Sequence, residues 1–91
     1  MREIYIRKLR YEDAKQKLER EIHNAFMEGE TLVEVVHGIG EGKLKQLTLD
    51  VAVTLDFIRV CEYGDFIYTN PGSTKLEILS PGKQNLKRYK N

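Results

Sequence analysis

The sequence predicts an α/β two-layer domain in which a four-stranded mixed sheet carries two helices on one face. Two observations support this fold class. Short segments alternate apolar and polar residues, as strands do, and two longer segments between them repeat apolar residues at helical spacing. The resulting order is βαβαββ. Because parallel strands are joined by right-handed crossovers, both helices are expected on the same face of the sheet.

The first half of the chain is predicted to form a strand, a helix and a second strand. Ile4 and Ile6 alternate with polar residues in the first strand and are expected to face the helices. The helix spans residues 11–28 and ends at Gly29. The second strand, residues 32–36, is nearly continuous in apolar residues, which is typical of a central strand parallel to the first. The helix presents one apolar stripe, formed by Ala14, Leu18, Ile22, Ala25 and Phe26.

The second half is predicted to add a helix and two strands. The helix runs from residue 43 to about residue 54, although β-branched residues near its end also favour a strand. A third strand is expected over residues 57–61. A long connection with turn residues follows over 63–73, and a last alternating strand covers 74–78. The helical stripe comprises Leu44, Leu47, Val51 and Leu55.

Composition and charge narrow the class of protein. The chain has 91 residues, enough for one domain with one modest core, here expected over residues 1–80. Residues 81–91 form a basic C-terminal tail, expected to be flexible, that could add phosphate contacts. No apolar run is long enough to cross a membrane, so we expect a cytoplasmic protein without a membrane partner. Cys61 is the only cysteine and is expected to be a buried small hydrophobe, which leaves no internal disulfide and no cysteine-rich zinc site.

Two pairs of residues are expected to meet at one edge of the predicted sheet. The carboxyl ends of parallel strands lie at the same edge, where ligands of open α/β sheets tend to bind. The first strand ends at Arg7 and Lys8 and the second at His37 and Gly38, and the second helix begins shortly afterwards. A helix N-terminus offers unpaired N–H donors and a partial positive charge, which suit an anion such as phosphate.

The side chains expected at this edge have chemistry suited to phosphate. Arg7 can grip a phosphate with two parallel hydrogen bonds, and Lys8 adds a point charge. Lys43 and Lys45 add positive charge from the first turn of the helix. His37 can donate a hydrogen bond to a phosphate oxygen, or accept a proton from an attacking hydroxyl or water.

The glycines of the loop allow close approach of a phosphate to the backbone; they are Gly38, Gly40 and Gly42. A simpler alternative is that these glycines only form the tight turn that starts the helix. In that case His37 is a hydrogen-bonded structural residue, and Arg7 and Lys8 form a solvated strand end. Two nucleotide motifs do not match. Leu44 stands where the P-loop has serine or threonine, and the third glycine of a dinucleotide fingerprint would come one residue later.

Residues 37–44 resemble the H-G-x-G-x-G loop of the Smr (small MutS-related) domain family, with the family's strand before the loop and its helix after it. Residues 4–9 occupy the place of the family's L-D-L-[HR]-G-L segment, and residues 72–78 resemble the glycine-rich beginning of its last strand. The resemblance implies a fold similar to the C-terminal domain of bacterial translation initiation factor three. It also implies binding of DNA or RNA, which several members cut with little sequence preference. Members occur alone or at the C-terminus of a MutS paralogue linked to recombination control and rescue of stalled ribosomes, so the resemblance also implies a connection with DNA repair.

The family's functional positions carry over onto a few residues of this chain. Its binding loop falls on His37, Gly38, Gly40 and Gly42, and the basic or histidine position of its first motif falls on Arg7.

Two residues of the first motif depart from the family. Tyr5 replaces its aspartate and Lys8 replaces its glycine. A tyrosine cannot supply a carboxylate at neutral pH, although Glu3 or Glu41 could replace it in space. Strong nuclease activity is therefore doubtful, whereas binding gains a positive charge at Lys8. An exposed Tyr5 could also stack on a base.

Three functions remain open from the sequence. The first is a nucleic-acid-binding module directed by the structure of DNA or RNA rather than by its sequence. The second is an endonuclease with His37 as general base and Arg7 stabilising the pentacovalent phosphate, with a divalent metal such as magnesium as the conditional cofactor. The third is a protein-interaction module whose partner is a MutS-type protein or the ribosome. The oligomeric state is left open.

Overall fold

A computed structural model gives the arrangement of the chain and describes residues 1–61 and 71–79. The βαβαββ order is confirmed. Most of the long connection expected over residues 63–73 lies outside the described residues, because residues 62–70 are not described. The same holds for the end of the fold near Pro81 and for the basic tail, which fall on residues 80–91. The elements are β1 (Arg2–Tyr5), α1 (Tyr11–Met27), β2 (Leu32–Val36), α2 (Lys43–Thr54), β3 (Ile58–Val60) and β4 (Ser73–Ile78).

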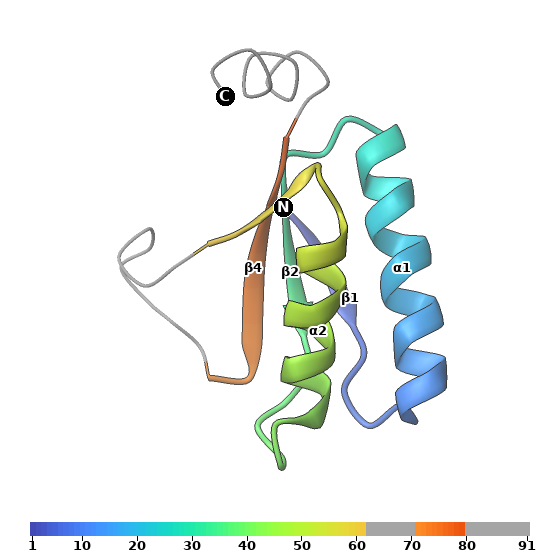
Figure 1. The fold of residues 1–91 in the computed structure, drawn as a ribbon, viewed down its shortest axis with the longest axis vertical. Coiled ribbons are helices and arrows are strands. Elements are labelled where there is room, and N and C mark those ends of the chain that lie inside the picture. The colour runs from blue at the N-terminus through green and yellow to red at the C-terminus, as the bar shows by residue number, and fades with distance from the viewer. Residues whose placement is uncertain (62–70, 80–91) are drawn as a thin grey trace.

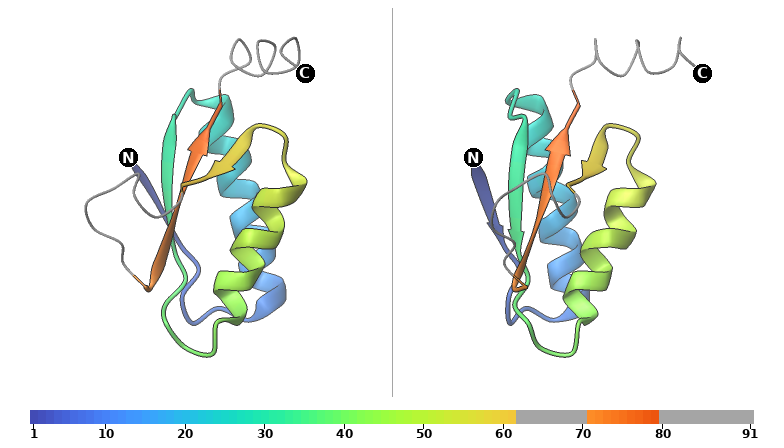
Figure 2. Two further views of the ribbon diagram at one scale, coloured as in Figure 1. Left: turned by 60° about the vertical axis from the view of Figure 1, so that its left-hand side comes forward. Right: turned by 90° about the vertical axis from the view of Figure 1, so that its left-hand side faces the viewer.

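The four strands form one mixed sheet in the order β1-β2-β4-β3. β1 and β2 are parallel, whereas β4 runs antiparallel to both of its neighbours. Both helices cover the same face of this sheet (Figures 1 and 2), as right-handed crossovers require. None of the helices in the described part of the chain is long and apolar enough to cross a lipid bilayer.

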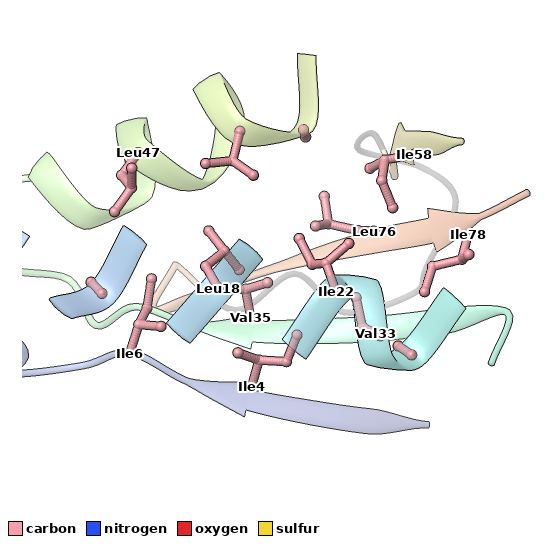
Figure 3. Packing of buried hydrophobic residues seen from close by; sticks show 14 residues of the cluster. Ile4, Ile6, Leu18, Ile22, Val33, Val35, Leu47, Ile58, Leu76 and Ile78 are labelled. Atoms are coloured by element: carbon pink, nitrogen blue, oxygen red, sulfur yellow. The ribbon is translucent and has the colours of Figure 1, made fainter. Parts of the chain in front are cut away.

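The core lies between the sheet and the two helices (Figure 3). The register places Val33 of β2 opposite Leu76 of β4, and Leu76 opposite Val60 of β3, so that one row of apolar side chains crosses the sheet. Four residues of the α1 stripe predicted from the sequence are fully buried against such rows; they are Ala14, Leu18, Ile22 and Ala25. Burying each large aliphatic side chain contributes roughly 1.5–3 kcal/mol, so this interface holds the two layers together.

The end of α1 follows the glycine signal in the sequence. Gly29 has a positive φ of 80°, which a residue without a Cβ adopts at little cost. Its N–H donates to the Phe26 carbonyl, and the N–H of Glu30 donates to the Ala25 carbonyl. This pair of hydrogen bonds is a Schellman motif, which satisfies the last carbonyl groups of the helix and turns the chain towards β2.

Besides shifts of one residue at the ends of α1, β3 and β4, two details differ from the sequence expectation. The first strand ends at Tyr5 rather than reaching Arg7, because the N–H groups of Ile6 and Arg7 both donate to the same Val36 carbonyl and the regular pairing stops there. Cys61 is half-buried rather than fully buried, at a position directly after the short strand β3.

Candidate functional site

Two loops meet at the carboxyl ends of the parallel strands, at the lower end of Figure 1. One is the β1–α1 loop, residues 6–10, and the other is the β2–α2 loop, residues 37–42. The contact between them is direct. A Cβ atom built on Gly38 would lie 3.1 Å from Cγ of Arg7, so the Arg7 side chain packs on the bare backbone of the glycine. The convergence predicted from strand order is therefore present in the structure.

An open pocket of about 680 Å³ lies between the two loops, and we call it the glycine-loop pocket. It is lined by residues 36–44 together with Arg7, Lys8 and Gly72. Among the site residues expected from the sequence, all but one line this pocket. The exception is Lys45, which is exposed on the first turn of α2.

Backbone N–H groups are available at this pocket because α2 begins without a capping side chain. Its N-cap is Gly42, in the left-handed conformation, and the first helical hydrogen bond runs from Gln46 N–H to the Gly42 carbonyl. The N–H groups of residues 43–45 therefore have no partner within the helix. Within the described part of the chain, those of residues 39–42 donate to no backbone carbonyl. Cβ atoms built on Gly40 and Gly42 would meet nothing within 4 Å, so this backbone faces open space.

The charge of the glycine-loop pocket favours an anion. Arg7, Lys8 and Lys43 line it with a single carboxylate, Glu41. The Glu41–Lys43 ion pair has a separation of 3.6 Å between two strongly exposed side chains, so it contributes little. The first turn of α2 holds no acid, although negative charge there would stabilise the helix through its dipole. Cations at this helix end are unfavourable for the fold alone, and a bound anion would offset that cost.

Other cations near the N-terminus serve the fold instead. Arg2 donates two hydrogen bonds, of 2.8 and 2.9 Å, to the Glu28 carboxylate and so joins β1 to the end of α1. Lys17 Nζ donates to the Tyr5 carbonyl over 2.6 Å. In the ranges 1–61 and 71–79, neither Arg7 nor Lys8 forms an ion pair. The structure thereby separates Arg2 and Lys17, which stabilise the fold, from Arg7 and Lys8, which line the pocket.

His37 lies beneath the loop and is only 4% exposed. Its Nδ1 is 2.8 Å from the Gly38 carbonyl oxygen, and its Nε2 is 2.8 Å from Oγ1 of Thr74. A carbonyl can only accept, so Nδ1 carries a proton and donates it to Gly38. In the neutral ring, Nε2 then accepts the hydroxyl proton of Thr74. Both ring nitrogens are occupied by the protein, and the ring joins the glycine loop to β4.

The beginning of β4 supplies contacts that the sequence did not reveal. The Gly72 carbonyl accepts the N–H of His37 over 3.0 Å and the N–H of Gly38 over 2.8 Å. Together with the Thr74 hydroxyl, it fixes the first residues of the glycine loop. The glycine-rich segment before β4 was the available sequence signal, but it did not indicate which residue of the chain Thr74 would contact.

Tyr5 lies on the sheet face opposite the helices and outside the glycine-loop pocket, 53% exposed. Its pKa is raised, chiefly by a hydrogen bond to Glu3 and by the negative charge of that carboxylate, so the phenol stays neutral at physiological pH. The carboxylate of Glu41 lies in the glycine-loop pocket, 3.6 Å from Nζ of Lys43. Among residues 1–61 and 71–79, no group of three or more histidine, cysteine, aspartate or glutamate side chains is placed so that it could hold a metal ion.

Comparison with known proteins agrees with this fold. The Smr domain family model matches residues 4–63 of the chain. The crystal structure of the Smr domain of Thermus thermophilus MutS2 is similar with a TM-score of 0.71 and 18% sequence identity, covering 86% of this chain and 98% of that chain. At this identity the likeness shows a shared fold. No curated protein sequence matches the chain.

Proposed function

The chain belongs to the Smr domain family, and from that premise we propose that it binds DNA or RNA at the glycine-loop pocket. The observation that carries the proposal is the combination of open N–H donors with positive charge at one place. The uncapped first turn of α2 and the loop before it supply the donors, and Arg7, Lys8 and Lys43 supply the charge. Phosphate groups are the part of a nucleic acid that such a site recognises.

Recognition of this kind depends on the structure of the nucleic acid rather than on its sequence. Backbone N–H groups and a bidentate arginine contact phosphate oxygens, which are the same at every nucleotide and carry no sequence information directly. Arg7 is well suited to this contact because its aliphatic part rests on Gly38, which holds the side chain over the pocket. Lys8 and Lys43 add charges from the two loops that flank it.

We assign His37 to holding the loop rather than to cutting the nucleic acid. A general base needs a nitrogen within reach of the attacking water, whereas Nδ1 and Nε2 of His37 are both engaged by Gly38 and Thr74. Tyr5 in place of the family's aspartate removes a second group that cutting would need. The proposal is therefore binding without strong nuclease activity.

A salt titration of binding tests the proposal. Fluorescence anisotropy of labelled duplex DNA and hairpin RNA, measured at increasing salt, should give a dissociation constant that rises steeply as counterion release becomes less favourable. Arg7→Ala and Lys43→Ala should weaken binding and lower the slope of log K against log salt by about 0.7–0.9 each. Arg20→Ala is the matched control, because it also removes one exposed cation but lies outside the pocket.

Four outcomes would count against this function. An affinity that does not depend on salt, or equal effects of Arg7→Ala and Arg20→Ala, would remove the glycine-loop pocket as the binding site. Cutting of plasmid or structured RNA by the unaltered chain, with or without magnesium, would favour the endonuclease alternative. Retention of a MutS-type protein or the ribosome after nuclease treatment of a lysate would favour the protein-interaction alternative.

A further inference from the structure

One apolar side chain stands among the cations of the glycine-loop pocket. Ile39 lies between Gly38 and Gly40 in the β2–α2 loop, and it is 69% exposed while lining the pocket. Both flanking glycines have positive φ, 80° and 37°, and neither has a side chain that could cover it. The loop therefore presents an aliphatic side chain beside the backbone donors and charges that a phosphate would approach.

Exposure alone does not indicate a binding role for Ile39, since single apolar residues are common on protein surfaces. Val53 on α2 is even more exposed, at 82%, but it does not line the pocket. Ile39 differs from Val53 in its position, because a polyanion bound to Arg7 and Lys8 in this pocket would also contact the Ile39 side chain. A ligand that offered only charged or strongly hydrated groups there would leave the aliphatic side chain without an apolar partner.

The proposal that follows rests on the proposed function and specifies its substrate class. We propose that Ile39 packs against an unstacked base, so that the domain prefers nucleic acid with unpaired or displaced bases over an intact duplex. An intact duplex covers its base faces by stacking and presents mainly base edges and phosphates. A bulge, gap or junction exposes apolar base faces next to phosphates. Aliphatic side chains contact such faces in proteins that insert them between base steps.

The combination of charges supports a nucleic acid as the occupant rather than an apolar protein surface. The pocket that Ile39 lines holds three cations and one carboxylate, and its backbone donors are unpaired in the described part of the chain. A purely apolar partner would bury these charges and donors without satisfying them, which is costly. A nucleic acid with an exposed base satisfies both parts of the pocket.

The test compares an intact DNA duplex with the same duplex carrying one bulged base, which adds only a single nucleotide and its phosphate. The variants are Ile39→Ala and, as a matched control, Val53→Ala, which truncates an exposed aliphatic side chain outside the pocket. The unaltered chain and Val53→Ala should bind the bulged duplex about tenfold more tightly than the intact one. Ile39→Ala should lose most of this preference, because much of the transfer free energy of the missing carbon atoms is forfeited.

A second readout localises the contact. A fluorescent base analogue placed at the bulge should change its emission when the unaltered chain binds, and this change should be much smaller with Ile39→Ala. Equal affinity for both duplexes, or an equal loss on both with Ile39→Ala, would overturn the assignment of Ile39 and leave the proposed binding site intact. Failure of the unaltered chain to bind the two duplexes and the hairpin RNA of the salt titration alike would instead overturn the proposed function, and the inference with it.

Discussion

Lys8 occupies a backbone conformation that favours glycine, and exchanging it should make the fold more stable. The N–H of Leu9 donates to the Ile6 carbonyl over 3.1 Å, which closes a tight turn. Lys8 is the third residue of this turn and has a φ of 68°, in the left-handed region. A type II turn normally has glycine at this position. The Smr family also has glycine here, so Lys8→Gly restores the residue that the geometry favours.

The expected gain follows from two opposing contributions. A residue with a Cβ in the left-handed region costs roughly 1–2 kcal/mol, and glycine removes that cost. Glycine also has more freedom in the unfolded chain, which offsets roughly 0.5–1 kcal/mol of the gain. The net increase in the free energy of unfolding is about 0.5–1 kcal/mol. For a domain of this size that raises the Tm by about 2–8 °C.

Thermal and urea unfolding of Lys8→Gly and Lys8→Ala separate the backbone contribution from the charge. Both variants lose the lysine charge, but only glycine relieves the positive φ, so Lys8→Ala should unfold near the temperature of the unaltered chain. Both variants should bind nucleic acid more weakly, since each lacks one phosphate contact. If Lys8→Gly is no more stable than Lys8→Ala, the argument that Lys8 occupies a strained position in this turn is wrong.

Three further predictions concern the loop and the start of α2. Gly38→Ala should lower the free energy of unfolding by about 1–2 kcal/mol in urea denaturation, because it combines a positive φ with a Cβ 3.1 Å from Arg7 Cγ; an unchanged midpoint would contradict this contact. Lys45→Glu should raise the free energy of unfolding in urea by about 0.3–1 kcal/mol, because a negative charge in the first turn of α2 is favoured by the helix dipole. The same change should weaken nucleic-acid binding. A loss of stability would contradict the charge argument for α2. Thr74→Val should cost about 1–3 kcal/mol in thermal unfolding, because it leaves Nε2 of buried His37 without a partner, and a neutral effect would show that this hydrogen bond is dispensable.

The elements with strong local patterns could be predicted from the sequence. The stripe from Ala14 to Ala25 has helical spacing, and Gly29 ends the helix as expected because few other residues adopt its conformation. The meeting of Arg7 with the glycine loop was also predictable, since parallel strands joined by a crossover have their carboxyl ends at one edge. These conclusions depend only on periodicity, on glycine and on chain topology.

The remaining features depend on contacts between distant segments. The environment of His37 is set by Thr74, 37 residues later in the chain, and becomes visible only once β4 is known to lie beside β2. The positive φ of Lys8 is not indicated by lysine itself, which has no preference for it, and the one pointer to it is the glycine that the family has at this position. Likewise, Arg2 and Arg7 are near neighbours in the sequence, whereas the fold pairs Arg2 with Glu28 and leaves Arg7 at the pocket.

The measurement that tests the central claim most directly is an NMR titration of the ¹⁵N-labelled chain with a short bulged duplex. If nucleic acid binds at the glycine-loop pocket, the largest shifts in the amide spectrum should fall on residues 39–45, whose N–H groups are open to a phosphate. Arg7→Ala should reduce these shifts at equal ligand concentration, and Arg20→Ala should not. Binding that shifts other amides and leaves those of residues 39–45 in place would contradict the account.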